Sequence, residues 1–270
     1  QQGRVPLGQA ALLRAIELNG TQIENNKAAF EWGRRCAHDG AAVRSLYQAA
    51  QVIEIVRKPS LDEVIARRVA LLTDYQDAAY AASYASFVER VRQAEAPLGG
   101  GLPLTEAVAR HLAKLMAYKD EYEVARLHTD AAFAARLGEM FEGDFKIVHH
   151  LAPPLIARTN ERGELVKRPY GPWIRGAFGL LAKMKGLRGG PLDVFGRTEE
   201  RRTERALIGE YRACIEELLR TLAAGNRAAA VEIARLPEEI RGFGHVKARH
   251  LAATRQKWDR LMAQWRAHSV

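Results

Sequence analysis

The densest group of residues that could do chemistry lies in a short polar segment, residues 118–126. Its candidate binding or interface residues are two tyrosines, two cations and a carboxylate: Tyr118, Lys119, Glu121, Tyr122 and Arg126. On a helix, residues three or four apart share a face. We therefore expect Tyr118 to stack on Tyr122, which neighbours Arg126, and Lys119 to pair with Glu123. The segment is either a buried network or binding surface, or an ordinary helix with surface ion pairs. We favour the ordinary helix because such pairs are common and weak.

A second dense cluster lies at residues 241–247, where two glycines flank Phe243. Glycines in this arrangement indicate a backbone that turns tightly. Arg241, His245 and Lys247 could gather around an anion at the N-terminus of the following helix. The simpler interpretation is a turn between helices with incidental basic residues. We favour it because turns more often connect than bind.

The histidines lack the spacing of a metal site. His149 and His150 are neighbours on an expected strand, where adjacent side chains point to opposite faces. His245 and His250 are five residues apart, which separates them by about 140° around a helix. We therefore predict no metal site in this chain.

Two glycine-containing segments resemble cofactor loops, but neither has the required context. The three glycines at 99–101 follow an expected helix, whereas a dinucleotide or phosphate loop follows a strand, and no Gly-Lys-Ser/Thr is present. The segment Gly143-Asp144-Phe145 lacks the last glycine of the Gly-Asp-Gly motif with which thiamine enzymes hold a metal pyrophosphate. We predict a linker at 99–101 and no cofactor in this segment of the protein.

The composition is that of a globular intracellular chain. Its 270 residues are 47% hydrophobic and 27% charged, which suffices for one large domain or two small ones. Cys36 and Cys214 match no metal or redox spacing, so we expect free thiols and a cytoplasmic location. No apolar run reaches about 18 residues, so no membrane span is expected. The start at Gln1, without methionine, indicates the middle of a longer chain.

Positive charge is concentrated between Arg158 and Arg197. The formal net charge of the chain is +9, and this stretch has nine Lys or Arg residues against three acids. Such an excess could attract nucleic acid, anionic lipid or an acidic protein. Its candidate contact residues are Lys183, Lys185 and Arg188. The alternative, which we favour, is a solvated arginine-rich face.

Helical periodicity dominates the sequence, so the expected fold class is mainly α. The clearest start signal is Ser60, which makes a capping box with Glu63. No Gly or Pro follows until Pro97, so one long helix near 60–96 is expected. The alternative is a break near Asp74–Asp77, although no residue there demands one. Thr105 and Thr198 are expected to cap later helices. The other expected helices cover residues 7–19, 21–37, 41–56, 105–126, 130–141, 171–185, 198–224 and 246–266.

The sequence changes character near residue 144. Residues 145–151 alternate between apolar and polar side chains, as a strand does. Residues 159–163 are typical of a turn, and residues 164–167 are again typical of a strand. This pattern predicts a small β-hairpin insertion near 144–168. Two or three strands are marginal alone, so the hairpin should pack on helices.

Several segments carry a resemblance to a known family. Residues 14–20 and 25–34 resemble the tail of the gamma domain of 2-oxoacid:acceptor oxidoreductases. The remainder of the chain is similar to the C-terminal domain of the indolepyruvate ferredoxin oxidoreductases. Four segments carry that likeness: 114–126; 141–145 with 151–154; 181–189 with 192–196; and 240–247. The likeness runs over nearly the whole chain and rests on the order and spacing of these segments, since no single motif is chemically diagnostic.

The resemblance implies two domains. Residues 1–40 would be the helical tail of the preceding gamma-type domain, and residues 41–270 the helical C-terminal domain. Independently of the resemblance, the proline- and glycine-rich loop at 97–104 is the candidate for an internal boundary. The implied parent enzyme oxidatively decarboxylates aryl-pyruvates, joins the product to coenzyme A and passes electrons to ferredoxin.

The resemblance also implies thiamine diphosphate, magnesium and iron–sulfur clusters in the parent enzyme. This chain has no matching ligand residues, so we carry over no catalytic residue. We expect a non-catalytic part that serves domain packing, subunit assembly or partner docking. Its expected partners are the other domains of the oxidoreductase, a second copy in a homodimer, and ferredoxin or coenzyme A, with no membrane and no preference for nucleic acid. The alternative is a freestanding basic helical module that binds nucleic acid or an acidic protein.

Overall fold

The computed structural model describes residues 7–46, 57–141, 143, 145–151 and 166–268. The chain divides into two compact units, Gln1–Lys58 and Pro59–Val270. The second unit therefore begins at Pro59, whereas the resemblance places a boundary after residue 40.

The first unit consists, in its described part, of three helices: α1 (Gln9–Asn19), α2 (Ile23–His38) and α3 (Gly40–Ser45). Gly20 ends α1 in the left-handed conformation, with φ 68°, which glycine adopts without steric strain. The predicted break after Asn19 is thus confirmed. The carboxylate of Asp39 accepts hydrogen bonds from two backbone N–H groups of α3. Residues 47–56 of the helix predicted over 41–56 lie outside the described part.

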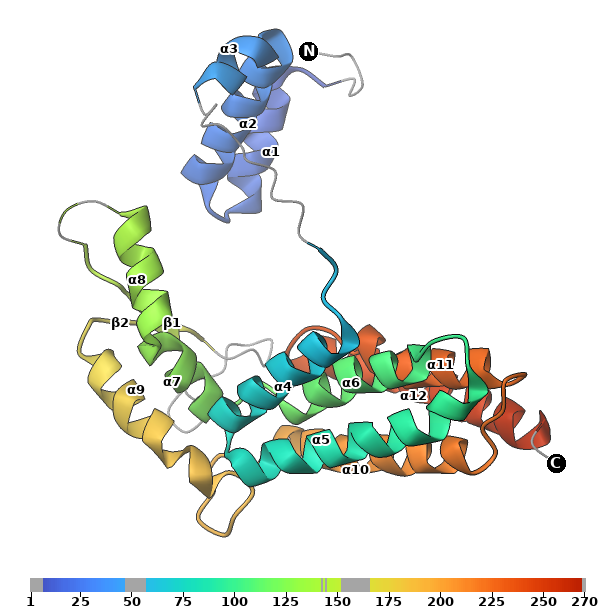
Figure 1. Cartoon of the computed structure of the whole chain (residues 1–270). Helices are drawn as coiled ribbons and strands as arrows, with labels where there is room; N and C mark the ends of the chain where they lie inside the picture. The colour runs from blue at the N-terminus through green and yellow to red at the C-terminus, as the bar shows by residue number, and fades with distance from the viewer. Residues whose placement is uncertain (1–6, 47–56, 142, 144, 152–165, 269–270) are drawn as a thin grey trace. The chain divides into compact units, whose positions relative to one another are not determined.

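The second unit contains the other helices and the strands of the described chain (Figure 1). The α-helices are α4 (Leu61–Tyr75), α5 (Ala78–Glu95), α6 (Pro103–Met116), α7 (Glu121–Thr129), α8 (Ala131–Met140), α9 (Ile174–Lys183), α10 (Glu199–Arg220), α11 (Arg227–Arg235) and α12 (Gly244–His268). Three short 3-10 helices are η1 (Ala96–Leu98), η2 (Met184–Leu187) and η3 (Leu236–Glu239). The mainly α fold class is confirmed. Residues 97–104, predicted as an internal boundary, lie within this unit and include the start of α6.

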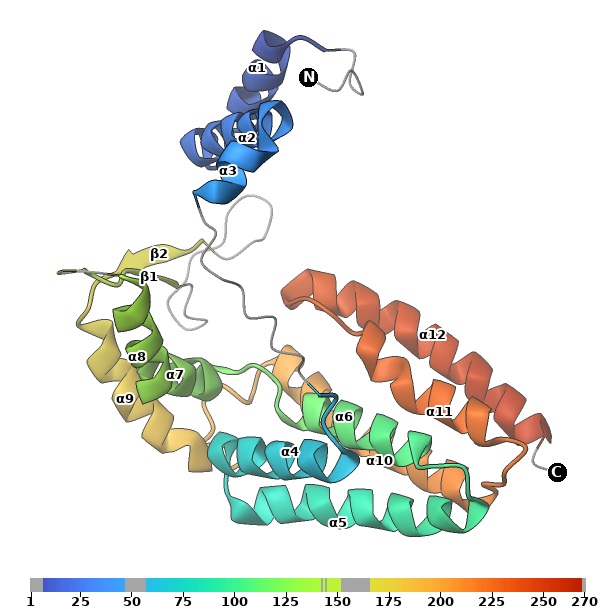
Figure 2. The ribbon, with the colours of Figure 1, turned by 45° about the horizontal axis from the view of Figure 1, so that its top comes forward.

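The single long helix predicted near 60–96 is wrong. Its start is confirmed, because the Ser60–Glu63 capping box forms, but the chain breaks between α4 and α5. The carboxylate of Asp77 accepts a hydrogen bond from the backbone N–H of Tyr80 at 2.7 Å and so starts a new helix. The two helices lie side by side (Figures 1 and 2). This return places Leu72 and Tyr84 in one core, which a straight helix could not do.

The helix predicted over 105–126 is also wrong, because it divides into α6 and α7. Thr105 does not cap it but lies inside α6. The buried carboxylate of Glu95 caps α6 instead, accepting hydrogen bonds from the backbone N–H groups of Leu104 at 2.8 Å and Thr105 at 2.7 Å. The Thr105 hydroxyl donates to the same carboxylate at 2.7 Å. Asp120 then caps α7. The predicted cap at Thr198 is confirmed, since its hydroxyl accepts from Arg201 N–H at 3.3 Å.

The main core joins α4, α5, α6, α10, α11, η3 and α12 (Figure 2). Buried tyrosines connect these helices through their hydroxyl groups. Tyr84 of α5 donates to the Ala109 carbonyl of α6 at 2.8 Å, and Tyr211 of α10 donates to the Ala234 carbonyl of α11 at 2.8 Å. Each ring contributes apolar burial while its polar end is satisfied.

A smaller core lies between α7 and α9 and supports the hairpin. The hairpin pairs β1 (His149–Leu151) with β2 (Arg168–Tyr170) in antiparallel register, with His149 opposite Tyr170. Leu151 and Tyr170 pack against this core, as expected for so small a sheet. The predicted hairpin is confirmed, but its second strand begins after residues 164–167. Residues 144 and 152–165, which include the predicted turn, lie outside the described part.

Candidate functional site

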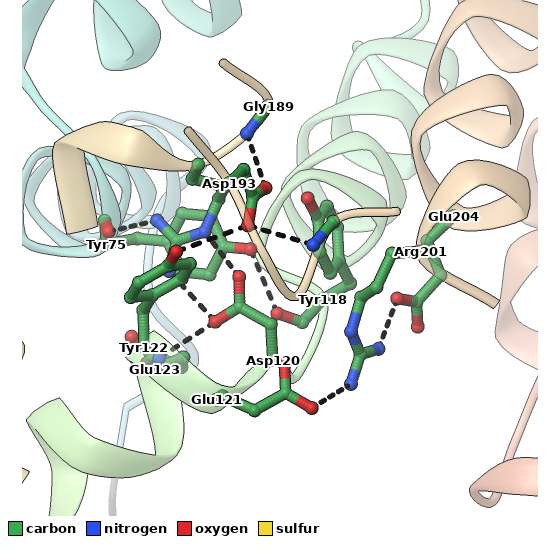
Figure 3. Close-up of polar contacts among 12 residues, drawn as sticks. Tyr75, Tyr118, Asp120, Glu121, Tyr122, Glu123, Gly189, Asp193, Arg201 and Glu204 are labelled. Atoms are coloured by element: carbon green, nitrogen blue, oxygen red, sulfur yellow. Dashed lines mark hydrogen bonds and ion pairs between the residues drawn. The ribbon is translucent and has the colours of Figure 1, made fainter. Parts of the chain in front are cut away.

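A buried ion pair between Arg188 and Asp120 is the centre of the polar network. Arg188 Nε donates to Asp120 Oδ2 at 2.5 Å, and Nη2 donates to Oδ1 at 3.0 Å. Each side chain is only 3% exposed. Arg188 Nη1 also donates to the Tyr75 carbonyl at 2.5 Å, and Asp120 accepts from the Glu123 N–H at 2.8 Å. The pair thereby joins the end of α4, the start of α7 and the segment after η2 (Figure 3).

Aromatic rings enclose the Arg188 guanidinium. Its central carbon lies 3.6 Å from the centre of the Tyr75 ring and 5.5 Å from that of Tyr122, which adds cation–π attraction. Burial alone would lower the pKa of Arg188, but the hydrogen bonds to Asp120 raise it. Burial also raises the pKa of Tyr75 far above its ordinary value. Arg188 therefore stays charged and Tyr75 stays protonated, so neither can exchange protons near neutral pH.

The loop at 189–196 is fastened to this network by Asp193. Its carboxylate accepts hydrogen bonds from Gly189 N–H at 2.7 Å, Gly196 N–H at 2.8 Å and the Tyr122 hydroxyl at 3.2 Å (Figure 3). Burial, followed by the nearby Asp193 carboxylate, raises the pKa of Tyr122 to about 12. A Cβ atom at position 196 would lie 2.1 Å from Asp193 Oδ2. Only glycine fits this close approach.

A second chain of charges connects α7, α10 and α12. Arg201 bridges Glu121 at 3.5 Å and Glu204 at 2.6 Å (Figure 3), and Lys247 also binds Glu204. Burial alone would lower the pKa of Arg201, but the Glu204 and Glu121 carboxylates raise it. The side chains of Arg201 and Glu204 are 12% and 6% exposed. These ion pairs are therefore part of the interior of the domain and not a solvated surface array.

The contacts predicted for Tyr118 and Lys119 are wrong, because both residues lie between the end of α6 at Met116 and the start of α7 at Glu121, where helical spacing does not apply. Tyr118 lies in the connection between α6 and α7 and meets the Tyr75 ring edge-on. Lys119 does not pair with Glu123 but lies 4.6 Å from the centre of the Phe243 ring. Glu123 instead binds Arg126 through two hydrogen bonds, at 2.7 and 2.8 Å. The favoured alternative of a helix with ordinary surface pairs is wrong for the buried members.

The basic stretch is also more than a solvated face. Arg188 is buried, and Lys185 donates to the Thr73 and Asp74 carbonyls at the end of α4, at 3.2 and 2.6 Å. Only Lys183, among the three candidates, is an exposed residue. The solvated-face interpretation is therefore wrong for Arg188, whose charge is committed to Asp120.

The cluster at 241–247 lies beside a hollow of about 370 Å³ lined by Arg241, Phe243 and Lys247, but not by His245. His245 is exposed. Arg241 Nε donates to the Glu238 carbonyl at 3.0 Å, and Lys247 binds Glu204. The three predicted anion ligands therefore do not converge, and the turn serves mainly to join η3 to α12.

Sequence reasoning missed the acidic partners and the aromatic wall of the network. Those residues are Tyr75, Asp120, Asp193, Arg201 and Glu204. Two local signals were available. Asp120 stands three residues before Glu123, a spacing typical of a helix start, and Asp193 stands three residues before Gly196, a spacing typical of a turn. No local signal could have joined Arg188 to Asp120.

The residues present do not fit the cofactors that the resemblance implies for the parent enzyme. A cluster of the four-cysteine type needs more thiolates than Cys36 and Cys214 can supply. Cys214 is buried, accepts a hydrogen bond from Trp258 Nε1 at 3.1 Å and has its pKa raised to about 11 by burial. Within the described residues no three His, Cys, Asp or Glu side chains are grouped to hold a metal. No helix in that part of the chain is both long and apolar enough to cross a membrane.

These features define a helical domain built around a buried arginine–aspartate pair. The chain belongs to a family of unknown function, DUF6537, which matches residues 61–260. The match falls within the second unit and includes every residue of the network from Tyr75 to Lys247. No curated protein and no solved structure matches the chain.

Proposed function

We propose that this chain is a non-catalytic helical part of an indolepyruvate (aryl-pyruvate) ferredoxin oxidoreductase, which oxidatively decarboxylates 2-oxoacids to acyl-coenzyme A. Its role is in domain packing, subunit assembly or partner docking. The observation that carries the proposal is that three of the four family-like segments contact one another, two of them through the buried Arg188–Asp120 network.

The contacts between these segments support a scaffold role. Asp120 and Tyr122 of the segment 114–126 bind Arg188 and Asp193 of the segment 181–196. Lys119 contacts Phe243 of the segment 240–247. These side chains contact one another. The residues that carry the resemblance are therefore also residues that hold this domain together.

The chemistry of the network also favours a scaffold over a catalyst. Arg188 keeps its proton because it is bound to Asp120, and Tyr75 keeps its own because its ring is buried. General acid–base catalysis needs a group whose pKa lies near the operating pH. In this proposal the thiamine diphosphate, magnesium and iron–sulfur clusters belong to other parts of the enzyme, with ferredoxin or coenzyme A as partners of the whole.

The test is an assay of the whole protein that carries this chain. Purified anaerobically, it should reduce a viologen dye in the presence of coenzyme A and indolepyruvate, and more slowly with pyruvate. Reduction should stop when coenzyme A is omitted. If no 2-oxoacid supports dye reduction by a protein with its full iron content, the proposed parentage is wrong.

A further inference from the structure

Three arginines surround a hollow of about 360 Å³ beside the loop at 189–196. They are Arg197 at the end of the loop and Arg202 and Arg205 on α10. The rest of the wall is the glycine-rich backbone of the loop and the Asp193 side chain. The volume is at the low end of ligand pockets, which span about 300–1,000 Å³. The hollow therefore suits a small ligand.

The three guanidiniums bind backbone carbonyls or no carboxylate at all in the described part of the chain. Arg197 Nη2 donates to the Pro191 carbonyl at 2.9 Å, and Arg205 Nη2 donates to the Gly196 carbonyl at 2.5 Å. Arg205 also donates a hydrogen bond to the Tyr118 hydroxyl oxygen, which opposes the rise that burial causes in the pKa of Tyr118. Among the described residues, none of the three forms an ion pair. By contrast, Arg188 and Arg201 are each paired with acids.

One nitrogen of this cluster is buried without any hydrogen bond. Nη1 of Arg205 has no partner among the described residues. A buried N–H group without a partner is destabilising, and more so when it is charged. Native structures rarely leave such a group unless it has a functional role. A Cβ atom at position 196 would lie 2.9 Å from this nitrogen, so the nitrogen lies beside Gly196 in the wall of the hollow.

The carboxylate of Asp193 does not cancel this positive charge. It faces the hollow but already accepts two backbone N–H groups and the Tyr122 hydroxyl. The acids of the first turn of α10, Glu199 and Glu200, are exposed and form no ion pair with Arg202. Three cations and one occupied carboxylate leave the hollow with an excess of positive charge.

We propose that the hollow formed by Arg197, Arg202 and Arg205 binds the phosphoryl group of a small phosphorylated ligand. Guanidinium groups bind phosphate oxygens through paired, charge-assisted hydrogen bonds. Three of them approach from the loop and from α10, so they can bind several oxygens of one tetrahedral group. The site is independent of the proposed parentage.

The experiment is calorimetric titration of the chain with inorganic pyrophosphate, compared with inorganic phosphate and citrate. We expect saturable binding of pyrophosphate, with citrate weaker although it is also a multiply charged anion. Arg202→Gln and Arg197→Gln should each weaken pyrophosphate binding by about tenfold or more, because each removes a charge and its charge-assisted hydrogen bonds to the anion. Arg202 is exposed, so its variant should keep the melting temperature of the parent without ligand.

The matched control is Arg249→Gln, which removes the same charge from an exposed position on α12. It should leave pyrophosphate affinity unchanged. Equal weakening by Arg249→Gln and Arg202→Gln would show diffuse attraction and overturn the site. So would the absence of saturable pyrophosphate binding at roughly 10 mM, where a millimolar site is nearly filled. Tighter binding of citrate than of pyrophosphate would overturn the ligand class.

Discussion

Arg188 and Asp120 are 68 residues apart in the sequence, yet they form a two-bond ion pair that is almost fully buried. The pair is buried with its hydrogen-bonding partners and with two tyrosine rings. Such a pair is weak evidence for net stability, because desolvation opposes the attraction between the charges. Removing one member is different, since the other charge is then left buried and unpaired.

Arg188→Met should therefore destabilise the chain strongly. We expect a loss of about 3–5 kcal/mol in the free energy of unfolding, the range for a broken buried pair. Urea unfolding followed by circular dichroism measures it. Lys183→Met is the matched control, because Lys183 belongs to the same basic stretch but is exposed, and it should change stability by no more than about 0.5 kcal/mol.

The double variant Asp120→Asn with Arg188→Met distinguishes the two roles of Asp120, which pairs with Arg188 and also caps α7. Asn is as good an N-cap as Asp, so the start of α7 should persist. The double variant should be more stable than the sum of the single losses predicts, with a coupling of about 0.5–3 kcal/mol. Strict additivity of the two losses would mean that the two charges do not interact.

Glu95→Gln should destabilise the start of α6. The Glu95 carboxylate is fully buried and accepts three hydrogen bonds, from two N–H groups and the Thr105 hydroxyl. The amide that replaces one oxygen is a donor, so it would face another donor, at a loss of about 1–3 kcal/mol. Glu89→Gln, at an exposed position of the same helix, should change stability by less than about 1 kcal/mol. Thermal and urea unfolding of both variants distinguish them.

Gly196→Ala should disturb the loop that Asp193 holds, because its Cβ would collide with the Asp193 carboxylate. The expected loss is about 1–3 kcal/mol, typical of forced repacking. Gly209→Ala is the opposite control. Its Cβ meets nothing within 4 Å and lies inside α10, so it should stabilise the chain by about 0.5–1 kcal/mol. Stabilisation by both substitutions would contradict the geometry at Gly196.

His111 should make stability depend on pH. Burial lowers its pKa to about 4 from 6.5, while Glu238 opposes this shift and Lys114 and Arg235 add to it. Between pH 6.5 and about pH 4, His111 is protonated in the unfolded chain but neutral in the folded chain. The contribution of His111 is therefore fully present above pH 6.5 and is lost as the pH falls toward 4. Relative to His111→Gln, the wild-type chain should lose at most about 3 kcal/mol over this window, as measured by urea unfolding at several pH values. A pH-independent difference would contradict the shift.

Local patterns in the sequence predicted much of the fold. Tyr84, Phe87 and Val91 are spaced by three and four residues, which puts them on one helix face, and all three are buried. The predicted caps at Ser60 and Thr198 form. Helix ends were harder to predict. Asp77 divides one periodic stretch into two helices because its side chain caps Tyr80, although the apolar pattern continues through it.

The polar network could not be predicted, because its contacts join distant segments. Helical spacing suggested Glu123 as the partner of Lys119, but the chain leaves α6 at Met116, so that spacing has no meaning there. Tyr75 ends α4 and Arg188 follows η2, 113 residues later, so only the folded chain brings them together. Local periodicity carries no information about such pairs.

The most direct test of the proposed scaffold role compares Asp120→Asn with Asp259→Asn in the proposed parent oxidoreductase. Asp120 is in the buried network, whereas Asp259 is exposed on α12. We predict that Asp120→Asn lowers the yield of assembled enzyme but leaves the indolepyruvate turnover per iron-loaded enzyme within about twofold of the parent, a change below about 0.5 kcal/mol. Asp259→Asn should change neither. A normal yield of assembled Asp120→Asn enzyme with a turnover lowered about a hundredfold or more, the scale of a lost catalytic group, would contradict the scaffold role.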